Sequence, residues 1–109
     1  MAKEVYILSN QTDDEEIVIA SESKEKMINF AVDYIIDNIE DEIEDEINEK
    51  IDENLEDEEY LKRYKYLKQE REKGIREWAT DLVNGKSKHR YSDELSNEFF
   101  VWIYIVKLI

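Results

Sequence analysis

The chain of 109 residues has no cysteine, no proline, one histidine and only two glycines. Without cysteine it has no disulfide scaffold, thiol nucleophile or thiolate zinc site, and this composition is compatible with a reducing compartment. Two separate glycines are too few for a glycine-rich loop that holds phosphate groups. The apolar run of residues 99–109 is about half of the ~20 residues that a membrane-spanning helix needs. These absences argue against thiol chemistry, nucleotide binding and a membrane span.

Candidate catalytic and metal-binding groups are also scarce. The single histidine, His89, lies between two basic residues in a polar segment, where we expect a solvated side chain rather than a general base. The carboxylates form neither a D-x-D-x-D-G calcium loop nor the E-x-x-H pattern of di-metal helix bundles. We therefore predict no catalytic residue, no metal ligand and no cofactor, and a protein that is not an enzyme.

Negative charge is what the chain has in excess. It contains 29 acidic and 15 basic residues, which gives a formal net charge of −14. Nucleic acids and anionic membranes repel such a chain, so we predict that it binds neither directly. A hydrophobic content of 41% indicates a folded protein, and the length fits a single domain of residues 1–109. No signal-peptide pattern follows Met1, so we expect a cytoplasmic protein.

The charge is segregated along the sequence. Residues 37–59 contain 14 acids and one base, Lys50, whereas residues 60–76 contain seven bases and two acids. A chain that used charge only for solubility would mix both signs over its surface. This segregation of charge therefore indicates a function beyond solubility.

The local patterns predict an α+β fold with the order ββααβ, in which a β-hairpin and a C-terminal strand form a three-stranded antiparallel sheet. Residues 4–20 form the hairpin, because two segments rich in β-branched residues flank a polar loop. Residues 98–109 form the last strand. Both of its faces are apolar, so we expect it to be central or to have its second face covered. If that face is uncovered, its aromatic side chains become an interaction site.

Two helices are predicted between the hairpin and the last strand. A long acidic helix covers residues 22–56, with Ser21 or Ser23 as its N-cap. A second, basic and aromatic helix covers residues 58–84 and ends at Gly85. The two are either joined into a continuous helix or folded back as a helical hairpin that brings the basic segment onto the acidic one.

An apolar residue occurs at every fourth position from Ile35 onward. At ~100° per residue, each step of four overshoots one turn by ~40°, so five steps carry the stripe ~200° around the helix. A straight helix cannot pack this stripe on one flat surface. We therefore expect a bend or break in the 40s or 50s, or successive isoleucines that contact different neighbours. The stripe consists of Ile35, Ile39, Ile43, Ile47, Ile51 and Leu55.

The acidic segment carries the candidate binding residues. At ~1.5 Å per residue its 14 acids place one charge every ~2.5 Å, between the ~3.4 Å of one DNA strand and the ~1.7 Å of the duplex. On one helix, five of them share an arc of ~80° opposite the isoleucines. The predicted row is Asp41, Asp45, Glu49, Asp52 and Glu56, with Glu42, Glu44, Glu46 and Glu53 as flanking residues. A solvated acidic helix, or one paired with the basic segment, is the alternative interpretation.

The order of elements resembles that of a group of small phage and mobile-element proteins. The likeness rests on a first strand "VYILS" (residues 5–9), the segment "EIVIASESKEKM" (residues 16–27) that leads into a helix, and one aromatic C-terminal strand. Acidic members of such sets resemble anti-CRISPR and anti-restriction proteins, which block a nuclease by imitating DNA. The resemblance implies an inhibitor in the cytoplasm of a bacterial host.

Charge layout and resemblance together give a leading hypothesis. In it, the acidic helix mimics DNA and occupies the nucleic-acid channel of a host defence nuclease, of CRISPR-effector or restriction type. The alternative is a structural or regulatory module that binds a partner, or a second copy of itself as a homodimer, through apolar sheet or helix surface. Salt-sensitive binding favours the first hypothesis and salt-insensitive binding the second.

Overall fold

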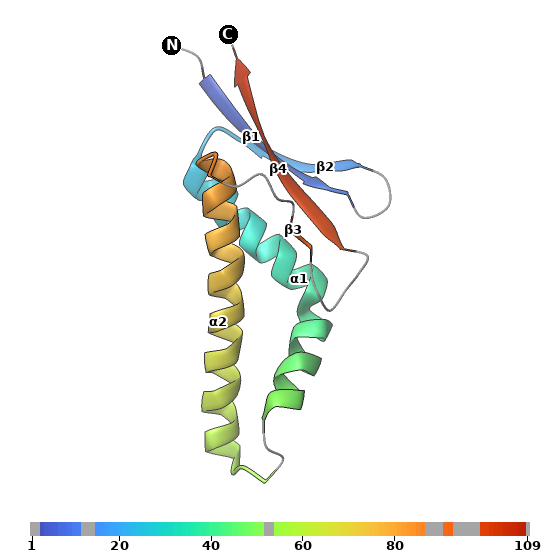
Figure 1. The fold of residues 1–109 in the computed structure, drawn as a ribbon, viewed down its shortest axis with the longest axis vertical. Coiled ribbons are helices and arrows are strands. Elements are labelled where there is room, and N and C mark those ends of the chain that lie inside the picture. Colours follow the sequence, from blue (N-terminus) through green and yellow to red (C-terminus); the bar gives the residue numbers. More distant parts are fainter. Residues whose placement is uncertain (1–2, 12–14, 52–53, 87–90, 93–98, 109) are drawn as a thin grey trace.

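The computed structural model describes residues 3–11, 15–51, 54–86, 91–92 and 99–108 (Figure 1). The predicted α+β fold with three antiparallel long strands and two helices in the order ββααβ is confirmed, and a strand of two residues is added to it. The elements are β1 (Lys3–Asn10), β2 (Glu16–Ser21), α1 (Lys24–Lys50), α2 (Asp57–Val83), β3 (Tyr91–Ser92) and β4 (Phe100–Leu108).

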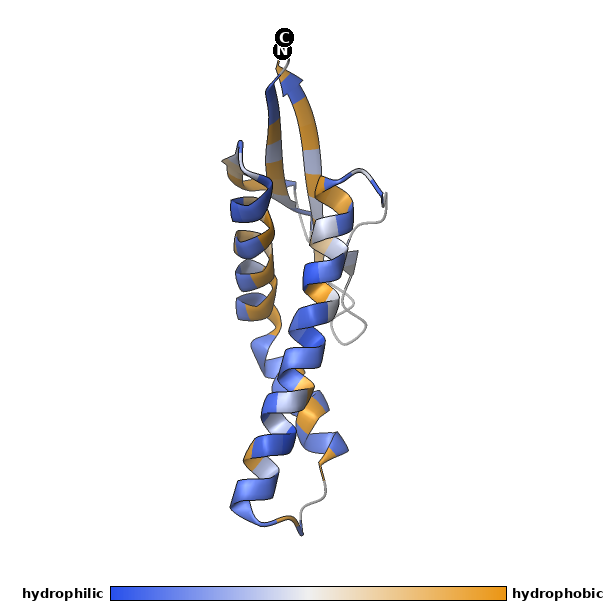
Figure 2. Cartoon of the chain, turned by 90° about the vertical axis from the view of Figure 1, so that its left-hand side faces the viewer, coloured by the Kyte–Doolittle hydropathy of each residue, from blue (hydrophilic) through white to orange (hydrophobic). Residues whose placement is uncertain are grey.

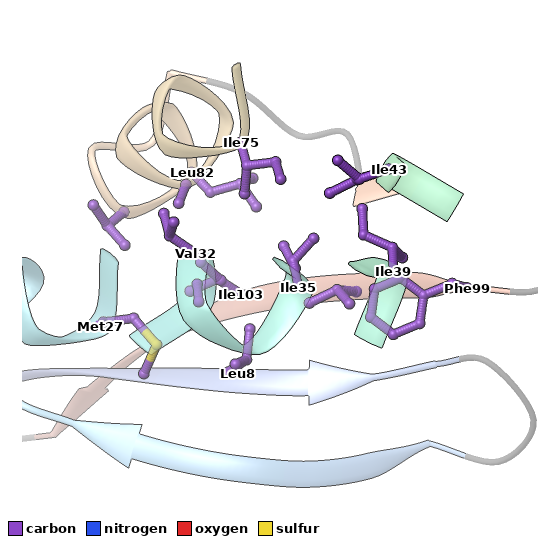
Figure 3. Packing of buried hydrophobic residues seen from close by; sticks show 14 of the residues in the cluster. Leu8, Met27, Val32, Ile35, Ile39, Ile43, Ile75, Leu82, Phe99 and Ile103 are labelled. Carbon is purple, nitrogen blue, oxygen red and sulfur yellow. The ribbon is translucent and has the colours of Figure 1, made fainter. Parts of the chain in front are cut away.

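The sheet has the strand order β2-β1-β4-β3, and β1 is central among the three long strands. β1 pairs with β4 along its whole length, with Leu8 opposite Ile103. Both of these side chains are buried, so they share the face that the helices cover (Figure 3). β3 pairs only with the first two residues of β4. The prediction that the C-terminal strand is central therefore holds only for its first residues.

Local signals set the beginning of α1 and the end of α2. Of the two predicted N-caps, Ser23 is the one used, because its hydroxyl accepts a hydrogen bond from the backbone N–H of Lys26 at 3.2 Å. Ser21 instead accepts a hydrogen bond from the N–H of Ser23 at 3.1 Å. At the other end, α2 stops at Val83, one residue before the predicted boundary. Gly85 follows with φ of +71°, the left-handed backbone conformation that commonly ends a helix and that glycine adopts without strain.

The predicted acidic helix 22–56 is wrong at its C-terminal end, because α1 stops at Lys50. The last backbone hydrogen bond of α1 runs from the N–H of Ile51 to the carbonyl of Ile47, at 3.1 Å. Carboxylates are unfavourable at the negative end of a helix dipole and favourable at its positive end. The acids of residues 57–59 accordingly form the first turn of α2 instead of extending α1. The two helices fold back as a hairpin, one of the two predicted arrangements.

The drifting isoleucine stripe is accommodated by a bend and by a change of neighbours. Ile39 has non-helical dihedrals (φ −119°, ψ 17°), so α1 kinks there, just before the region in which a bend was predicted. Before the kink, Ile35 lies between the sheet and α2 (Figure 3). Beyond it, Ile43 and Ile47 line a pocket together with Leu67 of α2. All five isoleucines of the stripe are at most 5% exposed. The helical hairpin of α1 and α2 is therefore lined by buried isoleucines from Ile35 to Ile51.

Beyond the sheet the helix pair continues as a projection, which we name the arm: residues 40–50 of α1 and 57–71 of α2 (Figures 1 and 2). Its outside is mostly hydrophilic (Figure 2). The molecule is elongated, with extents of 59 × 28 × 20 Å. The acidic segment thus lies on a thin extension away from the sheet.

Candidate functional site

Three of the five predicted row residues lie together on the outside of the arm. Asp41, Asp45 and Glu49 are exposed and follow one another at steps of four residues, or ~6 Å along the helix axis. Within the described part of the chain, none of the three forms an ion pair or a side-chain hydrogen bond. We name these residues the acidic stripe.

The other two row residues do not continue the stripe along α1. Glu56 is exposed and stands at the N-cap position of α2, where its side chain makes no capping hydrogen bond. Asp52 lies outside the described residues, as does the flanking Glu53. The prediction of a single helical row is wrong beyond Glu49, because its arithmetic assumed one helix through residue 56 and α1 ends at Lys50.

The flanking acids that the structure describes are half-buried and turn partly toward α2. The carboxylate of Glu44 accepts a hydrogen bond from the Tyr64 hydroxyl at 3.2 Å. Glu46 pairs with Lys50 at 3.1 Å and with Arg71 of α2 at 3.9 Å. Both acids therefore contribute to the contact between the helices, and neither belongs to the free surface of the stripe. Glu42 is half-buried without a described polar contact.

The Tyr64 contact has a measurable electrostatic signature. Burial is the largest cause that raises the pKa of Tyr64 above its ordinary value of 10.0, followed by the hydrogen bond to Glu44 and the negative charge nearby. The phenol is therefore protonated at neutral pH and donates to Glu44. Sequence analysis did not predict this polar role of Tyr64, which appears only when the helical hairpin brings α1 and α2 together.

The basic residues of α2 do not neutralise the stripe. Lys62, Arg63 and Lys65 are exposed, and none forms an ion pair with a described acid. The inward face of α2 is occupied by Tyr60, Tyr64 and the apolar residues that follow, which turns most of the bases outward. Within the described part of the chain, the ion pair that joins the two charged segments is that of Arg71 with Glu46, at 3.9 Å. The arm therefore carries an acidic surface on α1, and exposed basic residues on α2 beyond its acidic first turn.

A second candidate surface is the face of the sheet that points away from the helices. Trp102, Tyr104 and Val106 share it with Val5 and Ile7, since directly opposite residues of an antiparallel pair point the same way. Tyr104 and Val106 are 36% and 38% exposed, and no described helix packs on this face. The second face of β4 is thus uncovered among the described residues, which was the condition set for an interaction site.

A small polar network borders this sheet face. The Tyr104 hydroxyl donates to the carboxylate of Glu15 at 2.6 Å and accepts from the Gln11 amide at 3.1 Å. The hydrogen bond to Glu15 is the largest cause that raises the pKa of Tyr104, and partial burial follows. The indole of Trp102 packs edge-on against Tyr104, with 6.3 Å between ring centroids. These contacts hold both aromatic side chains in fixed positions on the face.

Comparisons with family models, with curated proteins and with solved structures found no match for this chain. In the described part of the chain, no helix is long and apolar enough to cross a membrane. The same residues contain no group of three or more histidine, cysteine, aspartate or glutamate side chains placed to hold a metal ion. His89 lies outside the described residues.

Proposed function

We propose that this protein is a non-enzymatic, phage-type inhibitor that places its acidic arm in the nucleic-acid channel of a host defence nuclease, of CRISPR-effector or restriction type, in the cytoplasm of a bacterial host. One observation supports the proposal: Asp41, Asp45 and Glu49 stay exposed and pair with no cation among the described residues, although α2 packs against α1 and carries exposed Lys62, Arg63 and Lys65. A protein that binds DNA or RNA presents lysine and arginine side chains already arranged for phosphates. Carboxylates on a thin arm are suited to meet them.

The energetics of the arm support this proposal. Like charges at i and i+4 destabilise a helix by ~0.2–0.5 kcal/mol per pair, so the stripe is unfavourable to folding. A lysine at position 45 would turn two repulsive pairs into attractive ones. The unfavourable arrangement becomes useful where a basic partner neutralises it, because complementary charge speeds association and selects the partner.

The uncovered sheet face favours a second candidate function. Trp102, Tyr104 and Val106 form an apolar surface that fits a structural or regulatory module binding through hydrophobic contact. Binding through this face would persist at high salt, since it does not depend on exposed charge.

The test uses tagged protein and a bacterial lysate, with captured proteins identified by mass spectrometry. The wild type is compared with the stripe variant D41N/D45N/E49Q and with the control variant E16Q/E22Q/D33N, which removes three exposed charges outside the arm. We expect wild type and control to capture a nuclease or other nucleic-acid-binding protein, and duplex DNA or ~0.5 M salt to release it. The stripe variant should capture none. Capture that is unchanged in the stripe variant, or no capture by the wild type, refutes the proposal.

A further inference from the structure

One edge of the sheet is open over most of its length. β3 pairs with β4 only at Phe100 and Val101. From Trp102 to Leu108, β4 has β1 on one side and no described strand on the other. This open edge is seven residues long, with Ile105 at its centre.

The direction of the backbone groups along this edge follows from one hydrogen bond. The carbonyl of Phe100 accepts from the N–H of Gln11, so the backbone polar groups of Phe100 point toward β1. In an antiparallel ladder this direction alternates, which turns the N–H and C=O groups of residues 102, 104, 106 and 108 toward β1 as well. Those of Ile103, Ile105 and Lys107 therefore point out of the open edge.

The side chains of this edge do not protect it. Natural edge strands are protected by charges, proline or bulges, but the open edge holds a single charge, Lys107. Ile105 and Leu108 are 37% and 49% exposed. By contrast, the β2 edge begins with Glu16, and its pairing with β1 contains a bulge. Of the two edges, the β4 edge is the one built to accept another strand.

We propose that the occupant of this edge is the same edge of a second copy, paired antiparallel about a two-fold axis at Ile105. In this register Ile105 pairs with Ile105 of the second chain, and Ile103 of each chain pairs with Lys107 of the other. All the outward N–H and C=O groups then find partners. Opposite side chains are also compatible, since Tyr104 meets Val106 and Trp102 meets Leu108.

The open edge fits this register from end to end. It is bounded by the β3 pairing at Val101 and by Leu108, so the register centred on Ile105 uses every open position of both chains and stops where β3 begins. Two copies of an edge can pair symmetrically about a residue only if the N–H and C=O groups of that residue point outward, and those of Ile105, the middle residue, do. This agreement between the middle of the edge and its hydrogen-bond pattern favours a second copy as the occupant.

The charge distribution also permits a second copy, despite the net charge of −14. The arm extends from the end of the sheet at which β4 begins, and β4 ends on the opposite side (Figure 1). Antiparallel pairing therefore directs the two acidic arms away from each other. Pairing of two strands buries less than the ~1,200–2,000 Å² of a standard interface, so we expect a dissociation constant on the order of tens of micromolar.

Cysteine cross-linking tests the register, because the natural chain has no cysteine. The Cα atoms of a hydrogen-bonded antiparallel pair lie ~5.5 Å apart, within the ~4.4–6.8 Å range of disulfides. I105C should therefore form a disulfide-linked dimer with oxidised glutathione. The matched variant K107C places its two thiols four residues out of register, ~13 Å apart. We expect I105C to cross-link about ten times faster than K107C, and equal rates contradict the proposed register.

Charge exchange at the same position gives an independent measurement by sedimentation velocity. I105K and I105E should each be monomeric, because like charges then stand directly opposite, whereas their equimolar mixture should dimerise. I17K, at the exposed β2 edge, should dimerise like the wild type. A wild type that stays monomeric at ~500 µM overturns the proposal. The inference does not depend on the acidic arm, since D41N/D45N/E49Q should retain the dimer.

Discussion

Neutralising the acidic stripe should stabilise the fold, and the size of the effect follows from the arm. Within the arm, D41N/D45N/E49Q removes two like-charged pairs at i,i+4, Asp41 with Asp45 and Asp45 with Glu49, each unfavourable by ~0.2–0.5 kcal/mol. It also removes a carboxylate from the last turn of α1, where the helix dipole opposes negative charge by ~0.3–1 kcal/mol. No described ion pair is lost. We expect the free energy of unfolding to rise by about 1 kcal/mol, and Tm to rise by ~4–8 °C.

Urea denaturation followed by far-UV circular dichroism measures this change. The difference from the wild type should shrink between ~0.02 M and ~0.5 M salt, because exposed charges are screened. The control variant E16Q/E22Q/D33N changes the same number of charges outside the arm and should gain less. A stripe variant that is less stable than the wild type would show that these carboxylates make stabilising contacts, and the reasoning behind the proposed function would fail.

Two further predictions test local contacts. S23A removes the hydroxyl that caps α1 and should lower the free energy of unfolding by about 1 kcal/mol in urea denaturation, whereas S21A should cost less. Y64F tests the contact with Glu44. Folding raises the pKa of Tyr64, so its contribution to stability is complete below pH ~10 and is lost as pH rises through the higher folded pKa. Wild-type stability should therefore fall at alkaline pH more steeply than that of Y64F, and parallel pH profiles would contradict the contact.

Elements defined by short-range signals could be predicted from the sequence. The β-hairpin, a serine cap at residue 21 or 23 and the end of α2 before Gly85 each depend on residues within one or two turns. The isoleucine drift required a bend or a change of neighbours, and both occur, but it did not fix the kink at Ile39. The spacing of the isoleucines gives their angular positions around the helix axis. It does not show at which residue the helix axis bends.

The end of α1 could not be located from composition, because the acidic run crosses it without interruption. No proline or glycine lies between residues 24 and 73, and helix formers occur on both sides of the boundary. The dipole argument separates the two helices only after α2 is known to begin at Asp57. The candidate row was predicted on one helix and therefore failed past Glu49. β3 was missed because two residues carry no pattern of their own and form a strand only against β4.

The proposed contacts place function at opposite ends of the molecule. The acidic stripe lies on the arm, and the open β4 edge lies on the sheet, so one can be removed without the other. In the proposed dimer the two arms point in opposite directions, so one compact channel accepts only one of them. Dimerisation would therefore add avidity only on a target with two correctly spaced channels, because a second site that the arm cannot reach contributes no effective concentration. On a target with one channel, the wild type and I105K should inhibit equally.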